Sequence, residues 1–507
     1  MRTRKSIRNV SVLFLTQFIT FVLAFVSRTV FIKTLGAEYL GLNGLFFNIL
    51  NALALAEMGI GTAIAYALYK PIAENDTEQI KSILSFYRKC YFVVGIFITI
   101  AGYFILPLLP YLIKDEVTIP VNIYSVYQCF LINSVIGYFF THKRTIIDET
   151  QNKYLTTTID FTINTIVTIV QIIILWKIQD YMAFLFTRIL GTIIISILIF
   201  IFANRKFPYI KEQAVNLSHS VKKKIWNDVS VVFFHKVGGL VILGTDFLII
   251  SAFVGIESVG IYSNYTLIIG AVTMFCHLFI QGADASIGNA IATLKEKDIY
   301  FIFRKIAFLI FCISGVSVIC LLNLLNPFIE LWIGKNYLLS DAVVYVIVAN
   351  FFFMQNRRLI LTFKFNAGLF RPDMYKPFIE MVFNLGISIF LVHIYGLLGV
   401  LIGTLANTFF INIWVEAFIV YKHIFSKSIV DYLKMYLIQV LALFFAYAIS
   451  FYINAFIDMF LLKCVVSVFV SISVYFLFFF RTMEFAYFVG IVRIILFRCD
   501  EDKSKDA

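Results

Sequence analysis

The fold of this chain is decided by the stretch Leu35-Gly36-Ala37-Glu38-Tyr39-Leu40-Gly41-Leu42, because it returns as Val254-Gly255-Ile256-Glu257-Ser258-Val259-Gly260-Ile261. Further matches follow in the same order: Glu57–Ala65 with Asp284–Ala292, Arg88-Lys89 with Arg304-Lys305, and Leu106–Pro110 with Leu322–Asn326. Only the loops between these matches differ in length. The sequence therefore predicts two related halves.

Nearly everything between and beyond the matches is hydrophobic. Of the 507 residues, 61% are hydrophobic and 14% are charged, whereas a soluble domain has roughly 25% charged residues. A helix that crosses a bilayer needs about 20 apolar residues, and the chain supplies about 14 such runs. They lie near residues 10–32, 42–68, 90–112, 121–141, 157–176, 180–203, 229–253, 258–281, 302–326, 341–362, 376–396, 397–421, 432–454 and 460–480. We predict an all-α polytopic membrane protein, with residues 483–497 as a short interfacial helix.

The distribution of positive charge gives an orientation. With the N-terminus in the cytoplasm and every run crossing, the outer segments hold few of the 42 Lys and Arg residues. The outer ones are Lys33, Lys114, Lys177, Lys335 and Lys463, and Arg28, Arg188 and Lys236 lie inside spans. All the others fall on the inner side, as the positive-inside rule expects. We therefore predict an even number of spans and two cytoplasmic termini.

The repeat and the charge pattern suggest how the chain is divided. We predict an N-terminal six-helix bundle over residues 1–203 and a basic cytoplasmic connector over 204–228. A C-terminal six-helix bundle would follow over 229–421, and two extra spans with a cytoplasmic tail over 422–507. Membrane proteins made of two related halves are usually transporters, with the substrate path between the halves.

Composition and motifs argue against several other classes. The net charge of +12 reflects membrane orientation and a connector suited to anionic headgroups, so no nucleic-acid partner is expected. The seven cysteines form no CxxC pair, so we expect neither a metal site nor a disulfide framework. The sequence has no Walker motif and no hydrolase pattern. We therefore expect a protein that is not an enzyme and needs no cofactor, apart from possible coupling to protons or sodium.

Two arginines lie deep in predicted spans, where an ionised side chain costs at least roughly 2.5–3.5 kcal/mol and normally faces a cavity or a partner. Arg28 either contacts an anionic substrate, since its planar guanidinium suits phosphate oxygens, or pairs with Glu57 on the next span. The same two interpretations hold for Arg188, for which we favour the structural one.

Acidic and amide side chains form a second group of candidates. Glu57 and Asp284 occupy matching places in the repeat, which shows a shared ancestral acid but leaves helix packing as an alternative role. Asp246, Glu380 and Asn384 are also buried in predicted spans, where carboxylates and amides could form a proton or sodium site.

Basic clusters end two corresponding spans on the inner side. They are His142-Lys143-Arg144 and Arg357-Arg358, and Asn152 and Asn366 lie eight residues after Arg144 and Arg358, respectively. Such clusters anchor a span at the inner surface. They could also form a cationic inner mouth for pyrophosphate headgroups, and the two roles are compatible.

The glycines of the opening stretch predict a tight hairpin. Gly36 and Gly41 flank an outer turn, as Gly255 and Gly260 do in the second half. Glycine permits positive φ and close backbone approach, so we interpret these residues as structural and not as ligand contacts.

The chain also resembles a known family. Residues Arg28–Leu42, Ala56–Gly61 and Leu68–Ala73 are similar to the first hairpin of bacterial oligosaccharide flippases, the polysaccharide transporters of the multidrug/oligosaccharidyl-lipid/polysaccharide exporter superfamily. The resemblance implies a V-shaped pair of six-helix bundles plus two C-terminal helices. It implies a flippase that moves undecaprenyl-pyrophosphate-linked oligosaccharide repeat units from the inner to the outer leaflet by alternating access, powered by an ion gradient.

The same resemblance suggests residue roles and partners. Arg28 would meet the pyrophosphate, with Lys70 and Arg144 at the inner mouth, and Arg188 and Arg358 complete the cationic candidates. The product would be a surface polysaccharide such as capsule or O-antigen, made at the bacterial cell membrane with a polymerase and glycosyltransferases as possible partners. A cation-coupled drug or metabolite antiporter of the same superfamily is the alternative. A membrane polymerase or glycosyltransferase is disfavoured because the outer loops are short.

Overall fold

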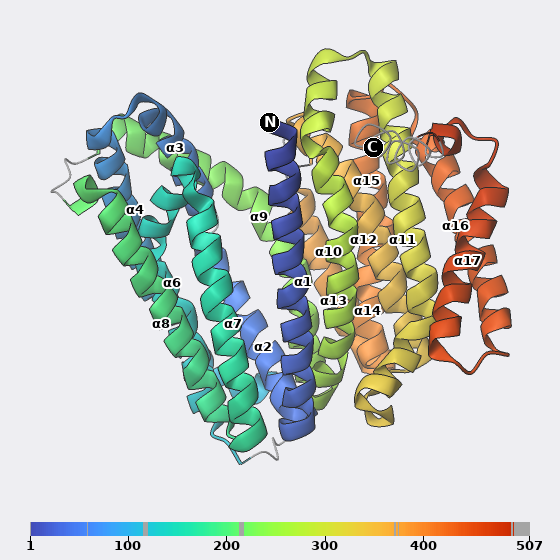
Figure 1. The fold of residues 1–507 in the computed structure, drawn as a ribbon, viewed down its shortest axis with the longest axis horizontal. Helices are drawn as coiled ribbons and strands as arrows, with labels where there is room; N and C mark the ends of the chain where they lie inside the picture. The colour runs from blue at the N-terminus through green and yellow to red at the C-terminus, as the bar shows by residue number, and fades with distance from the viewer. Residues whose placement is uncertain are drawn as a thin grey trace, which may run out of the picture. The chain divides into compact units, whose positions relative to one another are not determined.

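The computed structural model describes residues 2–57, 59–114, 120–211, 217–369, 372–373, 375–487 and 490, and these residues form helices and connecting loops without a β-strand. Contacts divide the chain into an N-terminal unit, Met1–Ser263, and a C-terminal unit, Asn264–Ala507. Figure 1 shows long helices running side by side within each of them.

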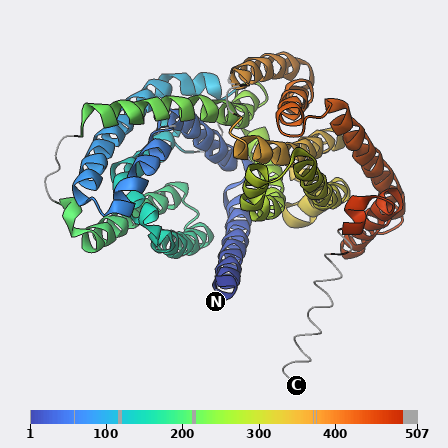
Figure 2. The ribbon, with the colours of Figure 1, turned by 90° about the horizontal axis from the view of Figure 1, so that it is seen from above.

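The N-terminal unit is built from long helices joined by short turns. They are α1 (Arg2–Leu35), α2 (Ala37–Leu53), η1 (Ala54–Glu57), α3 (Ile60–Glu74), α4 (Thr77–Ile105), η2 (Leu106–Leu108), α5 (Leu109–Leu112), α6 (Ile123–Ile147), η3 (Asp148–Asn152), α7 (Lys153–Lys177), α8 (Tyr181–Lys206), η4 (Pro208–Lys211) and α9 (His219–Phe253). Helix α6 packs against α4 and α8, and α7 packs against α1 and α8. Figure 2 shows α9, in green, lying along the side formed by α2 and α3, which it contacts.

Local sequence explains where these helices begin. The Asp76 side chain accepts a hydrogen bond from the Gln79 amide at the start of α4, and Asn122 and Asp180 cap α6 and α8 in the same way. Such caps satisfy amides that have no partner inside the helix. Gly36 and Gly255 have φ of 90° and 142°, so a tight turn is present at each of them, whereas Gly41 and Gly260 lie inside α2 and α10.

The second predicted span, 42–68, is broken in the structure. Helix α2 ends at Leu53, and α3 begins at Ile60 after Gly59, which has a φ of 94°. The corresponding position in the second half is Ser286, and α10 (Ile256–Thr293) passes through it without interruption. Serine rarely adopts positive φ, whereas glycine does so at little cost. Glycine at position 59 therefore permits the turn in the first half, and serine at position 286 does not favour one in the second.

The C-terminal unit contains the remainder of α10 and a second set of helices. They are α11 (Glu296–Ile333), η5 (Lys335–Tyr337), α12 (Asp341–Asn366), α13 (Lys376–Tyr395), α14 (Leu397–Asn407), η6 (Thr408–Asn412), α15 (Ile413–His423), α16 (Ile429–Asn454) and α17 (Phe460–Phe479). Helices α16 and α17 pack on each other and on α11. The Asn323 amide of α11 donates to Ser450 of α16 at 2.8 Å and to Ser467 of α17 at 3.3 Å.

Within the described residues, 10 helices are long and apolar enough to cross a membrane. Each coincides with a predicted span, so the prediction of an all-α polytopic membrane protein is confirmed. The other four predicted spans fall on α1, on the broken α2–α3 segment, on α9 and on α12. The V-shaped arrangement and the boundaries 1–203, 204–228, 229–421 and 422–507 stay predictions. Most of residues 483–497 lies outside the described residues.

Candidate functional site

The C-terminal unit contains a polar cavity of about 340 Å³ between α10 and α12. Helix α10 lines it with His277, Gln281 and Asp284, which recur at intervals of four and three residues and so share one helical face. Helix α12 contributes Arg358, Leu361, Thr362, Phe365 and Asn366 by the same spacing. The cavity therefore joins Asp284 and Arg358, which the sequence had suggested for different roles.

One end of this cavity is cationic. Arg358 is exposed, and no ion pair or hydrogen bond of its guanidinium is recorded within the described part of the chain. His277 lies near enough to interact electrostatically with Arg358. A guanidinium presents five donors in a planar fork that matches phosphate oxygens. This end of the cavity is therefore suited to an anion.

The opposite end carries a carboxylate and an amide. The Asn366 side-chain amide donates to Asp284 at 2.7 Å. A carboxylate accepts several hydrogen bonds, so Asp284 retains acceptor capacity after binding Asn366. Seven residues separate His277 from Asp284, which corresponds to about 10 Å along a helix. The two ends are thus chemically distinct and spatially separate.

The arginine next to Arg358 has a different environment. Arg357 donates to both carboxylate oxygens of Glu416 on α15 at 2.8 Å, and it lies 3.5 Å from Glu380 on α13. Lys376 contacts Glu380 at 2.6 Å and also binds Glu416. These four residues form a neutral buried cluster that ties α12, α13 and α15 together. Successive residues of a helix point about 100° apart, so Arg358 is directed away from this cluster.

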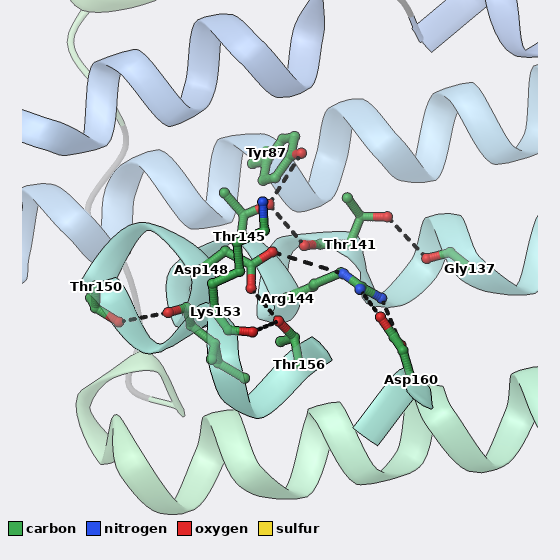
Figure 3. Close-up of polar contacts among 11 residues, drawn as sticks. Tyr87, Gly137, Thr141, Arg144, Thr145, Asp148, Thr150, Lys153, Thr156 and Asp160 are labelled. Carbon is green, nitrogen blue, oxygen red and sulfur yellow. Dashed lines mark hydrogen bonds and ion pairs between the residues drawn. The ribbon is translucent and has the colours of Figure 1, made fainter. Parts of the chain in front are cut away.

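The corresponding arginine of the N-terminal unit is neutralised by acids. Arg144 of α6 binds Asp160 of α7 and lies 3.9 Å from Asp148 in the π-helical turn η3 (Figure 3). The Thr156 hydroxyl donates to Asp148 at 2.5 Å. Arg144 and Arg358 occupy equivalent places in the repeat but have different partners. Arg144 closes a structural network, and Arg358 is left to the cavity.

Asn152 and Asn366 differ in the same way. The Asn152 side-chain oxygen accepts from Lys206 at 2.5 Å, and its amide donates to the Thr150 carbonyl at 2.8 Å. These contacts are local to η3 and the end of α8. In the second half the equivalent Asn366 binds Asp284 across the cavity.

The remaining basic candidates have specific environments. The Arg28 guanidinium, in α1, donates to the Ser263 hydroxyl of α10 at 2.6 Å. Arg188 lies over the Phe130 ring, with its guanidinium carbon 5.6 Å from the ring centroid. Lys70 is exposed and lies 3.8 Å from Glu74 on the same helix.

The acidic candidates are dispersed. Glu57 shares a hydrogen bond with Tyr91 of α4. Asp246 is buried in α9 near Tyr262. Glu380 belongs to the neutral cluster, and the Asn384 amide donates to Thr404 at 3.2 Å. Of the predicted coupling residues, the cavity contains only Asp284.

Sequence reasoning missed one polar contact within a helix and two sets of polar contacts between helices. Lys376 and Glu380 stand four residues apart, a spacing that places them on one helical face, so this pair could have been found. The contacts of Glu416 with α12 and α13 link segments distant in the chain. The same is true of Lys143, which donates to the Asn204 side chain at 2.8 Å.

Residues 6–284 match the model of a family described as polysaccharide biosynthesis protein. The chain belongs to the polysaccharide biosynthesis protein family. A search of curated proteins gives no match.

Several solved structures have a fold similar to that of this chain. The chain is similar to "Lipid II flippase MurJ, inward closed conformation", with a TM-score of 0.66 and 17% identity over 92% of this chain and 98% of that one. It is also similar to an inward-facing multidrug resistance MATE family transporter of the MOP superfamily, with a TM-score of 0.60 and 16% identity over 78% of this chain and 93% of that one. A third match is the MATE multidrug transporter DinF-BH, with a TM-score of 0.56 and 15% identity over 82% and 94% of the two chains. This polysaccharide biosynthesis protein thus shares its fold with a lipid II flippase and with MATE transporters.

Proposed function

We propose that the protein is a flippase for polyprenyl-pyrophosphate-linked oligosaccharide, of the undecaprenyl type, in the bacterial cytoplasmic membrane. It moves repeat units from the inner to the outer leaflet by alternating access, and the product enters a surface polysaccharide such as capsule or O-antigen. Both termini lie in the cytoplasm. Membership of the polysaccharide biosynthesis family and the fold shared with a lipid flippase support this proposal.

The cavity with its available Arg358 carries the proposal. A pyrophosphate with attached sugars cannot cross hydrocarbon unaided, because charged and polar groups lose their hydration there. A flippase must therefore supply polar contacts inside a helical bundle. Arg358 supplies an unneutralised guanidinium at the inner end of α12, whereas Arg357 and Arg144 are bound to carboxylates. Arg28, Lys70, Arg144 and Arg188 remain further candidates for contact with the substrate.

A deletion experiment tests this function. Cells without the gene should accumulate completed lipid-linked repeat units and lose the surface polymer, because the substrate would remain in the inner leaflet. Lipid-linked intermediates and surface polysaccharide are measured together, before and after the gene is restored. Unchanged lipid intermediates together with intact surface polymer would reject the flippase function.

A cation-coupled antiporter is the second candidate. The similarity to MATE transporters favours it, as does the Asp284 carboxylate in the cavity. An antiporter should change the sensitivity of cells to cationic compounds without altering lipid-linked intermediates. In the flippase, Asp284, Glu57, Asp246, Glu380 and Asn384 are candidates for coupling to protons or sodium.

A further inference from the structure

The two ends of the cavity between α10 and α12 differ in chemistry. Arg358 and His277 form a donor-rich end, and Asp284 with Asn366 forms an end rich in acceptors and amides. Gln281 lies between them on α10, and Phe365 adds an aromatic wall. A simple anion would need only the first end, and a neutral sugar only the second.

The dimensions fit a ligand with both features. The volume of about 340 Å³ falls at the lower end of the roughly 300–1,000 Å³ range of small-molecule sites. The separation of about 10 Å between His277 and Asp284 along α10 keeps a bound phosphate away from the Asp284 carboxylate. That distance leaves room for one sugar ring between the two ends.

We propose that this cavity binds the glycosyl phosphate portion of the substrate. The phosphate lies at Arg358 and His277, and the first sugar lies against Asp284, Gln281 and Asn366. This inference rests on the proposed flippase function and adds to it a specificity-determining residue. Asp284 accepts hydrogen bonds from sugar hydroxyl groups, and Asn366 holds its carboxylate in place.

Calorimetry on the full-length protein in lipid nanodiscs tests this assignment. The probes are glucose 1-phosphate, galactose 1-phosphate, N-acetylglucosamine 1-phosphate and inorganic phosphate. At least one sugar phosphate should bind about 10-fold tighter than inorganic phosphate, as expected for an added hydrogen bond to a charged group. Asp284→Ala should remove that preference without weakening phosphate binding, whereas Arg358→Ala should weaken every probe. Arg205→Ala, on an exposed position of α8, serves as the matched control.

Three results would overturn the assignment: binding of none of the four probes, an absent sugar preference, or a preference that survives Asp284→Ala. Rejection of this cavity as the binding site can be distinguished from rejection of the flippase function, because the function is tested separately, by measuring lipid-linked intermediates in cells. Deletion of the gene could cause those intermediates to accumulate while the purified protein binds none of the four probes. That pair of results would leave the flippase function intact and reject this cavity as the binding site.

A different observation concerns the glycines of the repeated stretch. A Cβ atom on Gly41 would lie 2.0 Å from the Ile256 carbonyl oxygen, and one on Gly260 would lie 2.1 Å from the Ala37 carbonyl oxygen. Neither distance is physically accessible. Helix α2 and the first turns of α10 therefore touch backbone to backbone, and these residues all belong to the N-terminal unit.

This contact is made twice by equivalent residues. In the repeat, Ala37 corresponds to Ile256 and Gly41 to Gly260, so each half supplies one glycine and one carbonyl. A second pair of contacts obeys the same correspondence. Arg28 donates to Ser263 at 2.6 Å, and their equivalents, Phe247 and Gly44, also meet, with the Phe247 ring 3.5 Å from a Cβ built on Gly44.

We call the backbone contact between α2 and α10 at Gly41 and Gly260 the glycine crossing. We infer, independently of the cavity, that the glycine crossing is the pivot about which the two repeats turn. A contact made by backbone atoms alone has no side chains to repack when the two helices rotate against each other. The Ser263 hydroxyl donates to the Gly260 carbonyl at 2.6 Å, so Arg28 acts through Ser263 on the crossing.

A disulfide across the crossing tests the pivot. Gly44→Cys with Val259→Cys suits a bridge, because a Cβ on Gly44 would lie 3.3 Å from the Val259 Cγ1 methyl carbon, which is where a cysteine sulfur at position 259 could lie. The seven native cysteines are first replaced. Export of surface polymer should stay within about twofold of the reduced protein when the bridge forms, because a pivot does not move. Loss of export that reductant restores would overturn the inference.

Two substitutions complete this test. Gly260→Ala should reduce export at least 10-fold, whereas Gly270→Ala should not, since a Cβ on Gly270 of the same helix meets nothing within 4 Å. Full export in Gly260→Ala, with normal protein abundance, would overturn the inference.

Discussion

Removing one acid from the buried cluster of α12, α13 and α15 should destabilise the protein strongly. Arg357 and Lys376 balance Glu380 and Glu416, and the four side chains are between 3% and 17% exposed. Glu416→Gln leaves two cations sharing one carboxylate in a membrane-spanning region. Breaking a buried ion pair by removing one partner costs about 3–5 kcal/mol, and we expect a loss of that size in the free energy of unfolding.

The matched comparison uses an exposed pair. Arg144 is 39% exposed in its contact with Asp160, which is 28% exposed, and pairs reached by solvent contribute about 0–1 kcal/mol. Asp160→Asn should therefore cost far less than Glu416→Gln. Both variants are purified in the same detergent and unfolded reversibly with increasing denaturing surfactant.

A double variant separates charge balance from simple loss of contacts. Lys376→Met combined with Glu416→Gln removes one charge of each sign and leaves Arg357 opposite Glu380. Because neutrality is restored, the double variant should be more stable than Glu416→Gln alone. A loss below about 1 kcal/mol in Glu416→Gln, or a double variant less stable than the single one, would refute this reasoning.

Other consequences concern helix contacts. Asn323→Ala removes the hydrogen bonds from α11 to Ser450 and Ser467. It should lower the free energy of unfolding by about 1 kcal/mol, as for polar contacts between membrane helices. Unfolding with denaturing surfactant measures this loss, and an unchanged midpoint would show that these bonds contribute nothing. Asp76→Ala removes the N-cap of α4 and should cost about 0.5–2 kcal/mol, measured by the same unfolding, with Asp76→Asn expected to recover most of the loss.

The fold could be predicted from sequence because its main determinants are local. Runs of apolar residues locate the helices, and Gly36 and Gly255 occupy turns with positive φ in both halves. The break before α3 was missed, although Gly59 stands where the second half has Ser286. The hydrophobic pattern continues through this position, so only the exchange of glycine for serine between the repeats indicates the break.

The candidate site could be predicted only in part, because its contacts link distant segments. The repeat identified Asp284 and Arg358 but could not show that they line one cavity. Arg144 and Arg358 look equivalent in sequence, and yet acids on α7 and η3 neutralise only the first of them. Which cation stays available depends on tertiary packing, and the repeat pattern does not encode it.

The most direct measurement of the central claim compares Arg358→Ala with Arg205→Ala in a strain that lacks the chromosomal gene. Membrane abundance, lipid-linked repeat units and surface polymer are quantified together. The account predicts that Arg358→Ala is inserted normally but accumulates lipid-linked repeat units and loses surface polymer, while Arg205→Ala behaves as wild type. Normal lipid intermediates and full surface polymer in Arg358→Ala would contradict it.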